Sequence, residues 1–309
     1  MRVVLVTGGA GFIGSNVVRA LLERGDRVRV LDNFSTGNRA NLAEIADDVD
    51  VVEGDLRSYE RVHAAVRGAE IVFHQGALPS VPRSVQDPLT TTAVNVEGTL
   101  NVLLAARDSG VRRVVNASSS SVYGNGGTLP RTESQLPQPI SPYAVAKLAA
   151  ESFCSSFSRV YDMEIVSLRY FNVFGPRQDP TSQYAGVVPR FISAVAAGEP
   201  VRIHGDGEQS RDFTFVANVV AANLLAAEAA DVQGAVINVA TGGSESINGL
   251  ADAIGRVLGK QVAKEYERER EADVRHSWAD LTEARARLGY EVHVGFEEGL
   301  EQTIASMNV

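Results

Sequence analysis

The sequence predicts an α/β protein built around a doubly wound parallel sheet. Short runs rich in Val, Leu and Ile alternate with amphipathic stretches from residue 2 to residue 172, and this alternation is typical of parallel strands joined by crossover helices. A glycine-rich turn also joins the first such run directly to the first amphipathic stretch. Beyond residue 172 the alternation weakens and Gly and Pro become frequent, which indicates a smaller C-terminal lobe.

Local patterns place the individual elements. The predicted strands cover 2–6, 28–32, 49–55, 69–74, 112–119 and 163–172, and the predicted helices between them cover 12–25, 58–67, 88–109 and 142–161. Helical segments continue at 187–197, 217–229 and 246–259. We therefore expect one unit over residues 1–172 and a second over 173–309, some segments of which return to the main sheet.

Composition and charge exclude several classes of protein. The 309 residues carry a formal net charge of −9 without a cluster of Lys and Arg, so we expect no nucleic-acid partner. No run of about 18 apolar residues predicts a membrane span, and the N-terminal segment lacks the pattern of a secretory signal. The expected location is therefore cytoplasmic. Cys154 is the one cysteine, which excludes an intramolecular disulfide and favours a buried packing role.

Three glycines after the first strand indicate a dinucleotide site. Gly8, Gly11 and Gly14 follow the G-x-x-G-x-x-G spacing. The turn must be tight, the backbone must approach a diphosphate closely, and the helix must pack near the strand, so each position favours a residue without a Cβ. An ordinary glycine-rich turn is the alternative. The strand before the motif and the helix after it favour a Rossmann-type site, with phosphates at the helix N-terminus.

Asp32 at the end of the second predicted strand favours NAD as the cofactor. A carboxylate at this place accepts hydrogen bonds from the ribose hydroxyls and repels the 2′-phosphate of NADP. A turn or helix-capping role is the alternative for Asp32. Asp55, after the third strand, fits a contact to adenine, although an ordinary loop aspartate fits nearly as well.

A tyrosine and a lysine one helical turn apart suggest proton-transfer chemistry. Tyr143 and Lys147 lie on one face of the predicted helix. An ammonium near a phenol lowers the pKa of the phenol, as a general base near neutral pH requires, and the same Lys can bond the nicotinamide ribose. Serines 118–121 end the fifth strand, where ligands bind to such sheets. Either pattern alone also occurs on solvated helices or in turns.

These motifs together resemble the extended short-chain dehydrogenases, and specifically the UDP-galactose/UDP-N-acetylglucosamine 4-epimerases. The resemblance covers essentially the whole chain, and the motifs are specific only in combination. They are TGGAGFIG (7–14), LDN (31–33), HQGAL (74–78), SSSSVYG (118–124), SPYAVAK (141–147), RYFNVFGPRQ (169–178), GDGEQSRDF (205–213) and READ (270–273).

The resemblance implies a reaction. Tightly bound NAD takes hydride from C4 of a UDP-hexose while Tyr143 takes the O4 proton, with Ser119 and Lys147 completing the catalytic set. The 4-keto sugar then turns and receives hydride on its other face, so no net oxidation occurs. Alignment on the Val-Tyr-Gly that follows the serines assigns the catalytic hydroxyl to Ser119, with Ser118 and Ser120 as alternatives one residue away.

The resemblance also assigns binding residues. The cofactor residues that it implies are Gly8, Gly11, Phe12, Ile13, Gly14, Asp32, Asn33, Asp55, Leu56, Gly76, Ala77, Leu78, Asn95, Tyr143, Lys147 and Tyr170. The substrate residues that it implies are Ser80, Ser119, Ser120, Tyr143, Asn172, Val188, Arg211, Arg270, Asp273 and Ser277. A guanidinium suits the diphosphate because it pairs two oxygens at once, although a salt bridge to Asp212 is an alternative role for Arg211. No metal is expected.

Two positions refine the expectation. Many family members carry a Lys directly after the segment that matches 74–78, whereas this chain has Pro79, so one cofactor contact is expected to be missing. In the family, the residue four after the one matching Asp273 gates the space beside C2 of the sugar. Here it is Ser277, whose small side chain leaves room for an N-acetyl group. We therefore expect UDP-GlcNAc and UDP-GalNAc as substrates in addition to UDP-glucose and UDP-galactose.

Other functions compete on the same fold. Nucleotide-sugar dehydratases resemble this chain but carry Asp-Glu after the catalytic hydroxyl, and UDP-glucuronate decarboxylases carry Glu at the second position, where this chain has Ser120 and Ser121. A non-catalytic NAD-binding protein would have a broken Ser/Tyr/Lys set, and a simple alcohol dehydrogenase would accumulate NADH. The resemblance also implies a homodimer through the helices near 88–109 and 142–161.

Overall fold

A seven-stranded parallel sheet forms the centre of the fold, as the sequence predicts. The computed structural model describes residues 2–180, 186–269 and 274–307. The strand order is β11-β6-β5-β4-β1-β2-β3, and every neighbouring pair in the sheet is parallel. The strands are β1 (Val3–Thr7), β2 (Arg27–Asp32), β3 (Val49–Glu53), β4 (Ile71–His74), β5 (Arg113–Ser119), β6 (Glu164–Tyr170) and β11 (Val236–Val239).

Helices cover both faces of this sheet, so its strands are buried and rich in Val, Ile and Leu. One face packs against α1 (Phe12–Glu23), α8 (Val216–Glu228) and α10 (Thr282–Leu288). The other face packs against α2 (Tyr59–Val66), α5 (Gly98–Asp108) and α6 (Pro142–Tyr161). The chain winds outward from β1 in both directions, and the crevice at the carboxyl ends of β1 and β4 is where such sheets bind their ligands.

The helix predicted over 88–109 is divided. It runs as α4 (Pro88–Thr92), a π-helical turn (Ala93–Glu97) and then α5. A π turn inserted into a helix is often found at a functional site. Asn95 lies on this turn, and its buried side chain contacts Leu78 in the segment after β4.

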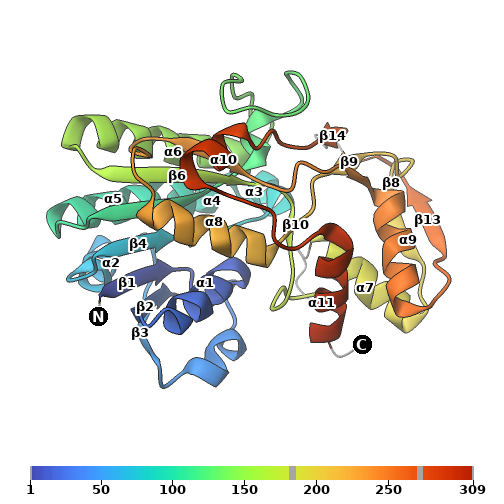
Figure 1. The fold of residues 1–309 in the computed structure, drawn as a ribbon, viewed down its shortest axis with the longest axis horizontal. Helices are drawn as coiled ribbons and strands as arrows, with labels where there is room; N and C mark the ends of the chain where they lie inside the picture. The colour runs from blue at the N-terminus through green and yellow to red at the C-terminus, as the bar shows by residue number, and fades with distance from the viewer. Residues whose placement is uncertain (1, 181–185, 270–273, 308–309) are drawn as a thin grey trace.

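A second group of elements builds its own apolar core to the right of the main sheet in Figure 1. It contains α7 (Val187–Ala197), β8 (Val201–His204), α9 (Ile247–Leu258), β13 (Lys264–Glu267) and α11 (Phe296–Ser306). Phe174, Phe213, Phe215 and Phe296 meet in its centre through edge-on and stacked ring contacts. The strand β11 and helix α8 lie instead with the main sheet. The division of the chain at residue 172 stays a prediction.

The remaining elements are short. They are η1 (Arg39–Ile45), α3 (Val81–Gln86), η3 (Ser120–Tyr123), β7 (Val173–Phe174), β9 (Ser210–Arg211), β10 (Thr214–Phe215), β12 (Glu245–Ser246) and β14 (His276–Ser277). The strand β9 pairs with both β12 and β14, and β7 pairs with β10. Across the described part of the chain, the helices are all too short or too polar to span a bilayer.

Candidate active site

The glycine turn between β1 and α1 leaves no room for side chains. A Cβ on Gly14 would lie 2.1 Å from the Gly8 carbonyl oxygen, and a Cβ on Gly8 would lie 2.6 Å from Gly76 Cα. Gly8 also has φ of +68°, which favours glycine. Gly11 caps α1 without any side-chain hydrogen bond, so the N–H groups of Phe12 and Ile13 face the crevice uncovered by a capping side chain. This cradle fits a dinucleotide diphosphate.

Asp32, the residue predicted to bind the ribose, lies at the carboxyl end of β2. Its carboxylate accepts hydrogen bonds from the backbone N–H of Ala10 at 2.9 Å and of Phe34 at 2.8 Å. The loop after β2 closes over it, because a Cβ on Gly37 would lie 2.9 Å from both carboxylate oxygens. Burial raises the pKa of Asp32, and these backbone bonds oppose that rise. The remaining lone pairs can accept ribose hydroxyls.

Asn33 and Asp55 meet beside Asp32. The Asn33 amide donates to Asp55 Oδ2 at 2.9 Å, and the Arg57 guanidinium donates to both Asp55 oxygens at 2.8 and 2.9 Å. The hydrogen bonds from Arg57 hold the pKa of Asp55 well below its usual range. These two predicted cofactor residues therefore lie together beyond the ends of β2 and β3. Arg57, which sequence analysis did not single out, keeps Asp55 ionised.

The segment after β4 is held by Asn95. The Asn95 side chain accepts from Leu78 N at 2.8 Å and donates to Leu78 O at 3.1 Å. Gly76 N donates to Thr7 Oγ1 at 3.1 Å, and Leu56 fills the space beside Gly76. The structure therefore brings together the predicted cofactor residues Leu56, Gly76, Ala77, Leu78 and Asn95. Both ends of the Asn95 amide are hydrogen-bonded to the backbone of Leu78.

His74 is a buried residue that sequence analysis missed. Its Nδ1 lies 2.7 Å from Thr7 Oγ1 and its Nε2 lies 3.0 Å from Thr99 Oγ1. Because Thr99 donates its own proton to Asn95 O, Nε2 of His74 carries the proton and Nδ1 accepts from Thr7. Burial, and then the charge of Lys147, lowers the pKa of His74 to about 3. The ring is therefore neutral and links β1, β4 and the π turn.

Ser119 and Tyr143 lie within hydrogen-bonding range of each other. The N-cap of α6 is Ser141, with Pro142 in its first turn, so the helix begins immediately before Tyr143 and directs the phenol toward the end of β5. Burial raises the pKa of Tyr143, and the hydrogen bond with Ser119 opposes this rise. Ser84, which sequence analysis missed, accepts from Tyr143 N at 3.0 Å and anchors the start of α6.

The expectation that Lys147 lowers the pKa of Tyr143 is not met in this structure. The Lys147 ammonium donates to Ala117 O on β5 at 2.9 Å and does not contribute to the Tyr143 shift. Lys147 is 7% exposed, and burial lowers its own pKa to about 8, with Cys154 and Glu151 opposing that fall. The net effect at Tyr143 is a raised pKa because its own desolvation outweighs the Ser119 hydrogen bond.

The three neighbouring serines have different environments. Ser118 is buried and donates to Glu151 Oε1 at 2.5 Å, so its hydroxyl faces the core. Ser119 is partly exposed and accepts from Ser121 N at 3.2 Å. Ser120 begins η3 and is also partly exposed. Of the three, Ser119 lies beside Tyr143, which supports the assignment made from the sequence.

Tyr170 ends β6, and Asn172 follows it toward the second lobe. The Tyr170 hydroxyl lies 3.1 Å from both Gln75 Oε1 and Asn223 Oδ1, so a contact with the cofactor would come from its ring or backbone. Asn172 has φ of +27°, an unusual conformation for a residue with a side chain. Its carbonyl accepts from Thr214 N at 3.3 Å. That bond ties the end of β6 to the second lobe.

Arg211 and Ser277 are brought together by strand pairing. They are register partners between β9 and β14, although 66 positions separate them in the sequence. The alternative of a salt bridge to Asp212 is wrong. The Asp212 carboxylate is fully buried and accepts from Thr241 and from the N–H groups of Gly242 and Ala279, so it faces away from Arg211.

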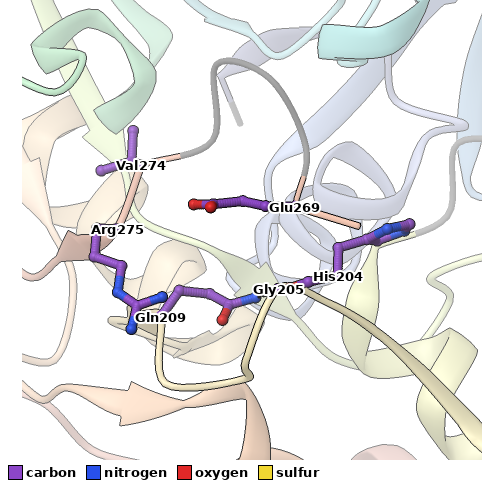
Figure 2. Close-up of a pocket in the computed structure, with 6 residues that line it drawn as sticks. All are labelled: His204, Gly205, Gln209, Glu269, Val274 and Arg275. Carbon is purple, nitrogen blue, oxygen red and sulfur yellow. Dashed lines mark hydrogen bonds between the residues drawn. The ribbon is translucent and has the colours of Figure 1, made fainter. Parts of the chain in front are cut away.

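A small cavity of about 10 Å³ lies beside β9 (Figure 2), with room for about one water molecule. It is lined by His204, Gly205, Gln209, Glu269, Val274 and Arg275. Gln209 Nε2 donates to His204 O at 2.7 Å, and Arg275 O accepts from Ser210 N at 2.9 Å and from Arg211 Nη1 at 3.3 Å. The backbone of Arg275 therefore helps to orient Arg211.

The other predicted substrate residues are distributed around the same region. Ser80 is buried and caps α3 by accepting from Arg83 N at 3.0 Å. Val188 is buried in the first turn of α7. Arg270 and Asp273 lie outside the described residues. The structure thus places the cofactor candidates with the main sheet and divides the described substrate candidates: Ser80, Ser119, Ser120 and Tyr143 lie with the main sheet, whereas Val188, Arg211 and Ser277 lie on α7, β9 and β14.

Comparison with known proteins identifies relatives over the whole length of the chain. Residues 4–240 match the model of the NAD dependent epimerase/dehydratase family. A UDP-glucose 4-epimerase of Mycolicibacterium smegmatis is 40% identical and aligns over 97% of this chain and 96% of its own length.

Two solved structures share the fold closely. A UDP-N-acetylglucosamine 4-epimerase from Methanobrevibacter ruminantium, in complex with UDP-N-acetylmuramic acid, has a TM-score of 0.94 at 40% identity and covers 99% of this chain and 98% of its own. The UDP-glucose 4-epimerase of Thermus thermophilus, in complex with NAD, has a TM-score of 0.91 at 38% identity and covers 99% of both chains. With its glycine cradle, Asp32 and the Ser119–Tyr143 contact all in place, this chain belongs to the NAD dependent epimerase/dehydratase family.

Proposed function

We propose that this chain is an NAD-dependent 4-epimerase that interconverts UDP-glucose and UDP-galactose, and also UDP-GlcNAc and UDP-GalNAc. One observation supports this proposal above the others. Ser119, Tyr143 and Lys147 converge at the carboxyl ends of β4 and β5, beside a glycine cradle that fits a dinucleotide. The similarity to 4-epimerases over nearly the full chain favours inversion over other chemistry on this fold.

The cofactor region suits NAD rather than NADP. Gly8, Gly11 and Gly14 leave space for the diphosphate, and Phe12 and Ile13 offer backbone N–H groups. Asp32 presents a carboxylate where NADP would carry its 2′-phosphate. The negative charges of the carboxylate and the phosphate would repel each other. When bound, NAD supplies reversible oxidation and reduction at C4 of the sugar.

Residues of the chain transfer the proton of the C4 hydroxyl and hold the sugar in position. Tyr143 accepts the proton of the C4 hydroxyl and later returns it, while Ser119, hydrogen-bonded to the phenol, shares that proton. Lys147 keeps a cation beneath the site and anchors α6 to β5 through Ala117 O. Arg211 on β9 is the proposed partner of the substrate diphosphate, and Asn172 and Val188 flank the nucleotide. Arg270 and Asp273 are proposed for the same nucleotide from the sequence resemblance alone.

The site lacks the carboxyl residues that dehydratases and decarboxylases of this fold carry after the catalytic hydroxyl. Dehydratases of this fold need an acid and a base to expel a hydroxyl, and the decarboxylases carry a Glu at the second position after the catalytic hydroxyl. Ser120 and Ser121 occupy those positions in η3. Glu151 is near, but its carboxylate is buried and bonded to Ser118 and Arg169. It is therefore not available to act on the sugar.

The proposed N-acetyl substrates rest on Ser277. It is buried on β14 and paired with Arg211, so its small side chain borders the substrate region. Substitution by a large aromatic residue would fill that space. The range of sugars is separate from the 4-epimerase chemistry, and one experiment tests both.

The decisive test is incubation of purified enzyme with UDP-GlcNAc and, separately, with UDP-glucose, without added NAD, with the anomeric and C4 protons followed by NMR. We expect both C4 epimers to appear without accumulation of NADH. Unchanged sugar, even after NAD is supplied, would overturn the proposed reaction. A UDP-GlcNAc rate below about a hundredth of the UDP-glucose rate, roughly 2.7 kcal/mol of discrimination, would overturn only the N-acetyl range.

We also propose that the protein is a homodimer assembled through α5 and α6. The outer face of α6 carries the small residues Ala149, Ser152 and Ser156 between the exposed Val145 and Val160. Such a row lets a second helix approach closely while the valines bury apolar surface. Helix α5 lies beside α6 on the same side of the sheet (Figure 1).

A charged substitution on this row is expected to separate the subunits. Ser152→Arg should shift the protein from dimer to monomer in analytical ultracentrifugation, because a guanidinium would have to be buried without a partner. The matched control is Ser134→Arg in the exposed loop after η3, which should leave the association unchanged. A wild type that sediments as a monomer would refute the homodimer, and a dimer unaffected by Ser152→Arg would place the interface elsewhere.

A further inference from the structure

We propose that Glu151 is a positioning residue of the active site. It holds Ser118 on β5 and Arg169 on β6 at once, and so fixes Ser119 relative to Tyr143 and Lys147 on its own helix α6. This inference deepens the proposed 4-epimerase function and rests on it. Glu151 itself does not touch the sugar.

Two bonds from α6 fasten the end of β5 immediately before Ser119. Lys147 Nζ donates to Ala117 O at 2.9 Å, and Ser118 Oγ donates to Glu151 Oε1 at 2.5 Å. Glu151 lies one helical turn after Lys147, which itself lies one turn after Tyr143, so the three side chains share one face of α6. Ser119 comes directly after the two anchored residues. A change in either bond would therefore move its hydroxyl relative to the Tyr143 phenol.

The second partner of Glu151 makes this anchor rigid. Arg169 donates to Glu151 Oε1 at 2.9 Å and to Oε2 at 2.8 Å, and both side chains are 4% exposed. The Arg169 guanidinium also lies 4.6 Å from the centre of the Tyr123 ring, and Tyr123 belongs to the turn that follows Ser119. The carboxylate thus joins β5, β6 and the turn after the serines to the helix that carries Tyr143.

Stability alone is a weak reason for such an arrangement. Burying an ion pair costs desolvation that its attraction often does not recover, and apolar replacements are frequently as stable. Here one guanidinium nitrogen of the pair, Arg169 Nη1, has no hydrogen-bond partner within the described part of the chain. The pair does fix the orientation of the Glu151 and Arg169 side chains, because a bidentate contact holds both in one geometry.

The pKa of Lys147 gives a second, independent measure of the position of Glu151 on α6. The groups whose charges act on Lys147 are Cys154 and Glu151 on α6, and the neutral His74 on β4 is a titratable group on which Lys147 acts in turn. Burial lowers the pKa of Lys147 to about 8, and the negative charge of Glu151 opposes this fall. Removing that charge should lower the pKa of Lys147 further. Removing only the Ser118 hydroxyl should leave it unchanged.

Ser118→Ala is the cleanest test, because it deletes one hydrogen bond and no charge. We expect kcat to fall roughly tenfold, as a slight misplacement of a reacting group does, with KM within about twofold of the wild type. The matched control is Ser158→Ala, a serine on α6 that is also 4% exposed and whose hydroxyl has no hydrogen-bond partner within the described residues. It should leave kcat unchanged. Equal kcat in Ser118→Ala and wild type would overturn the inference.

Glu151→Gln supplies the readout that does not depend on turnover. The chain has three lysines, at 147, 260 and 264, so the side-chain NMR signal of Lys147 can be assigned by its loss in Lys147→Arg. Its pKa should fall in Glu151→Gln and stay unchanged in Ser118→Ala and Ser158→Ala. An unchanged Lys147 pKa in a folded Glu151→Gln variant would contradict the inference. If that variant does not fold, the Ser118→Ala result decides alone.

Failure of the proposed reaction and failure of the role of Glu151 give different results. A wild-type enzyme that interconverts no UDP-hexose refutes the proposed reaction. An active wild type whose Ser118→Ala variant is equally active refutes only the role of Glu151.

Discussion

Tyr143→Phe is expected to lower kcat for UDP-glucose epimerisation by about 10³-fold, because it removes the group that takes and returns the O4 proton. Positioned acid–base groups typically contribute about 10²- to 10⁴-fold. The ring stays, so the packing of α6, the NAD content and the unfolding midpoint should be close to those of the wild type. The measurement is kcat and KM for both enzymes, with bound NAD determined after denaturation.

A control on the same helix separates loss of the hydroxyl from general damage to α6. Tyr161→Phe removes a phenol at the far end of α6, where the side chain is 46% exposed, and it should keep wild-type activity. A Tyr143→Phe enzyme that retains more than about a tenth of wild-type kcat would show that another group carries the proton. Since burial raises the pKa of Tyr143, the wild-type rate should also increase with pH above neutrality, as more phenolate forms.

Gly14→Ala is expected to destabilise the protein by at least about 3 kcal/mol and to abolish NAD binding. The added Cβ would lie 2.1 Å from Gly8 O, 2.8 Å from Gly8 C and 2.9 Å from Gly9 Cα. These are backbone atoms of the turn itself, so no side-chain rotation can relieve the contact. The turn would have to open, and α1 would move away from the place where it faces the phosphates.

The measurements for this variant are the free energy of unfolding in urea and the affinity for NAD by calorimetry. The matched control is Gly295→Ala at the N-cap of α11, where an added Cβ would meet no heavy atom within 4 Å. It should change stability by less than about 1 kcal/mol and leave NAD affinity unchanged. A Gly14→Ala protein that binds NAD normally would show that the turn can adapt, and that the diphosphate is not held there.

Several features of this protein follow from the sequence alone because they depend on neighbours along the chain. The spacing of Gly8, Gly11 and Gly14 between a strand and a helix predicted the cradle that the structure contains. Asp32 at the end of the next strand, and Tyr143 and Lys147 one helical turn apart, are equally local patterns. The fold class followed from alternating apolar runs. The division of the predicted helix over 88–109 by a π turn did not follow from these local patterns, and neither did the contacts of Arg57, His74 and Ser84.

Contacts between distant segments were decided only by the tertiary structure. Identical residues at 118 and 119 face a buried carboxylate and the Tyr143 phenol respectively, because a strand directs successive side chains to opposite faces. Lys147 is bonded to Ala117 O, so its effect on Tyr143 could not be predicted from the i, i+4 spacing. Strand pairing brings Arg211 beside Ser277. The packing of α6 against β6 brings Glu151 to Arg169. Local spacing determines turns and helix faces, whereas the partner of a buried polar group depends on which strands and helices fold against it.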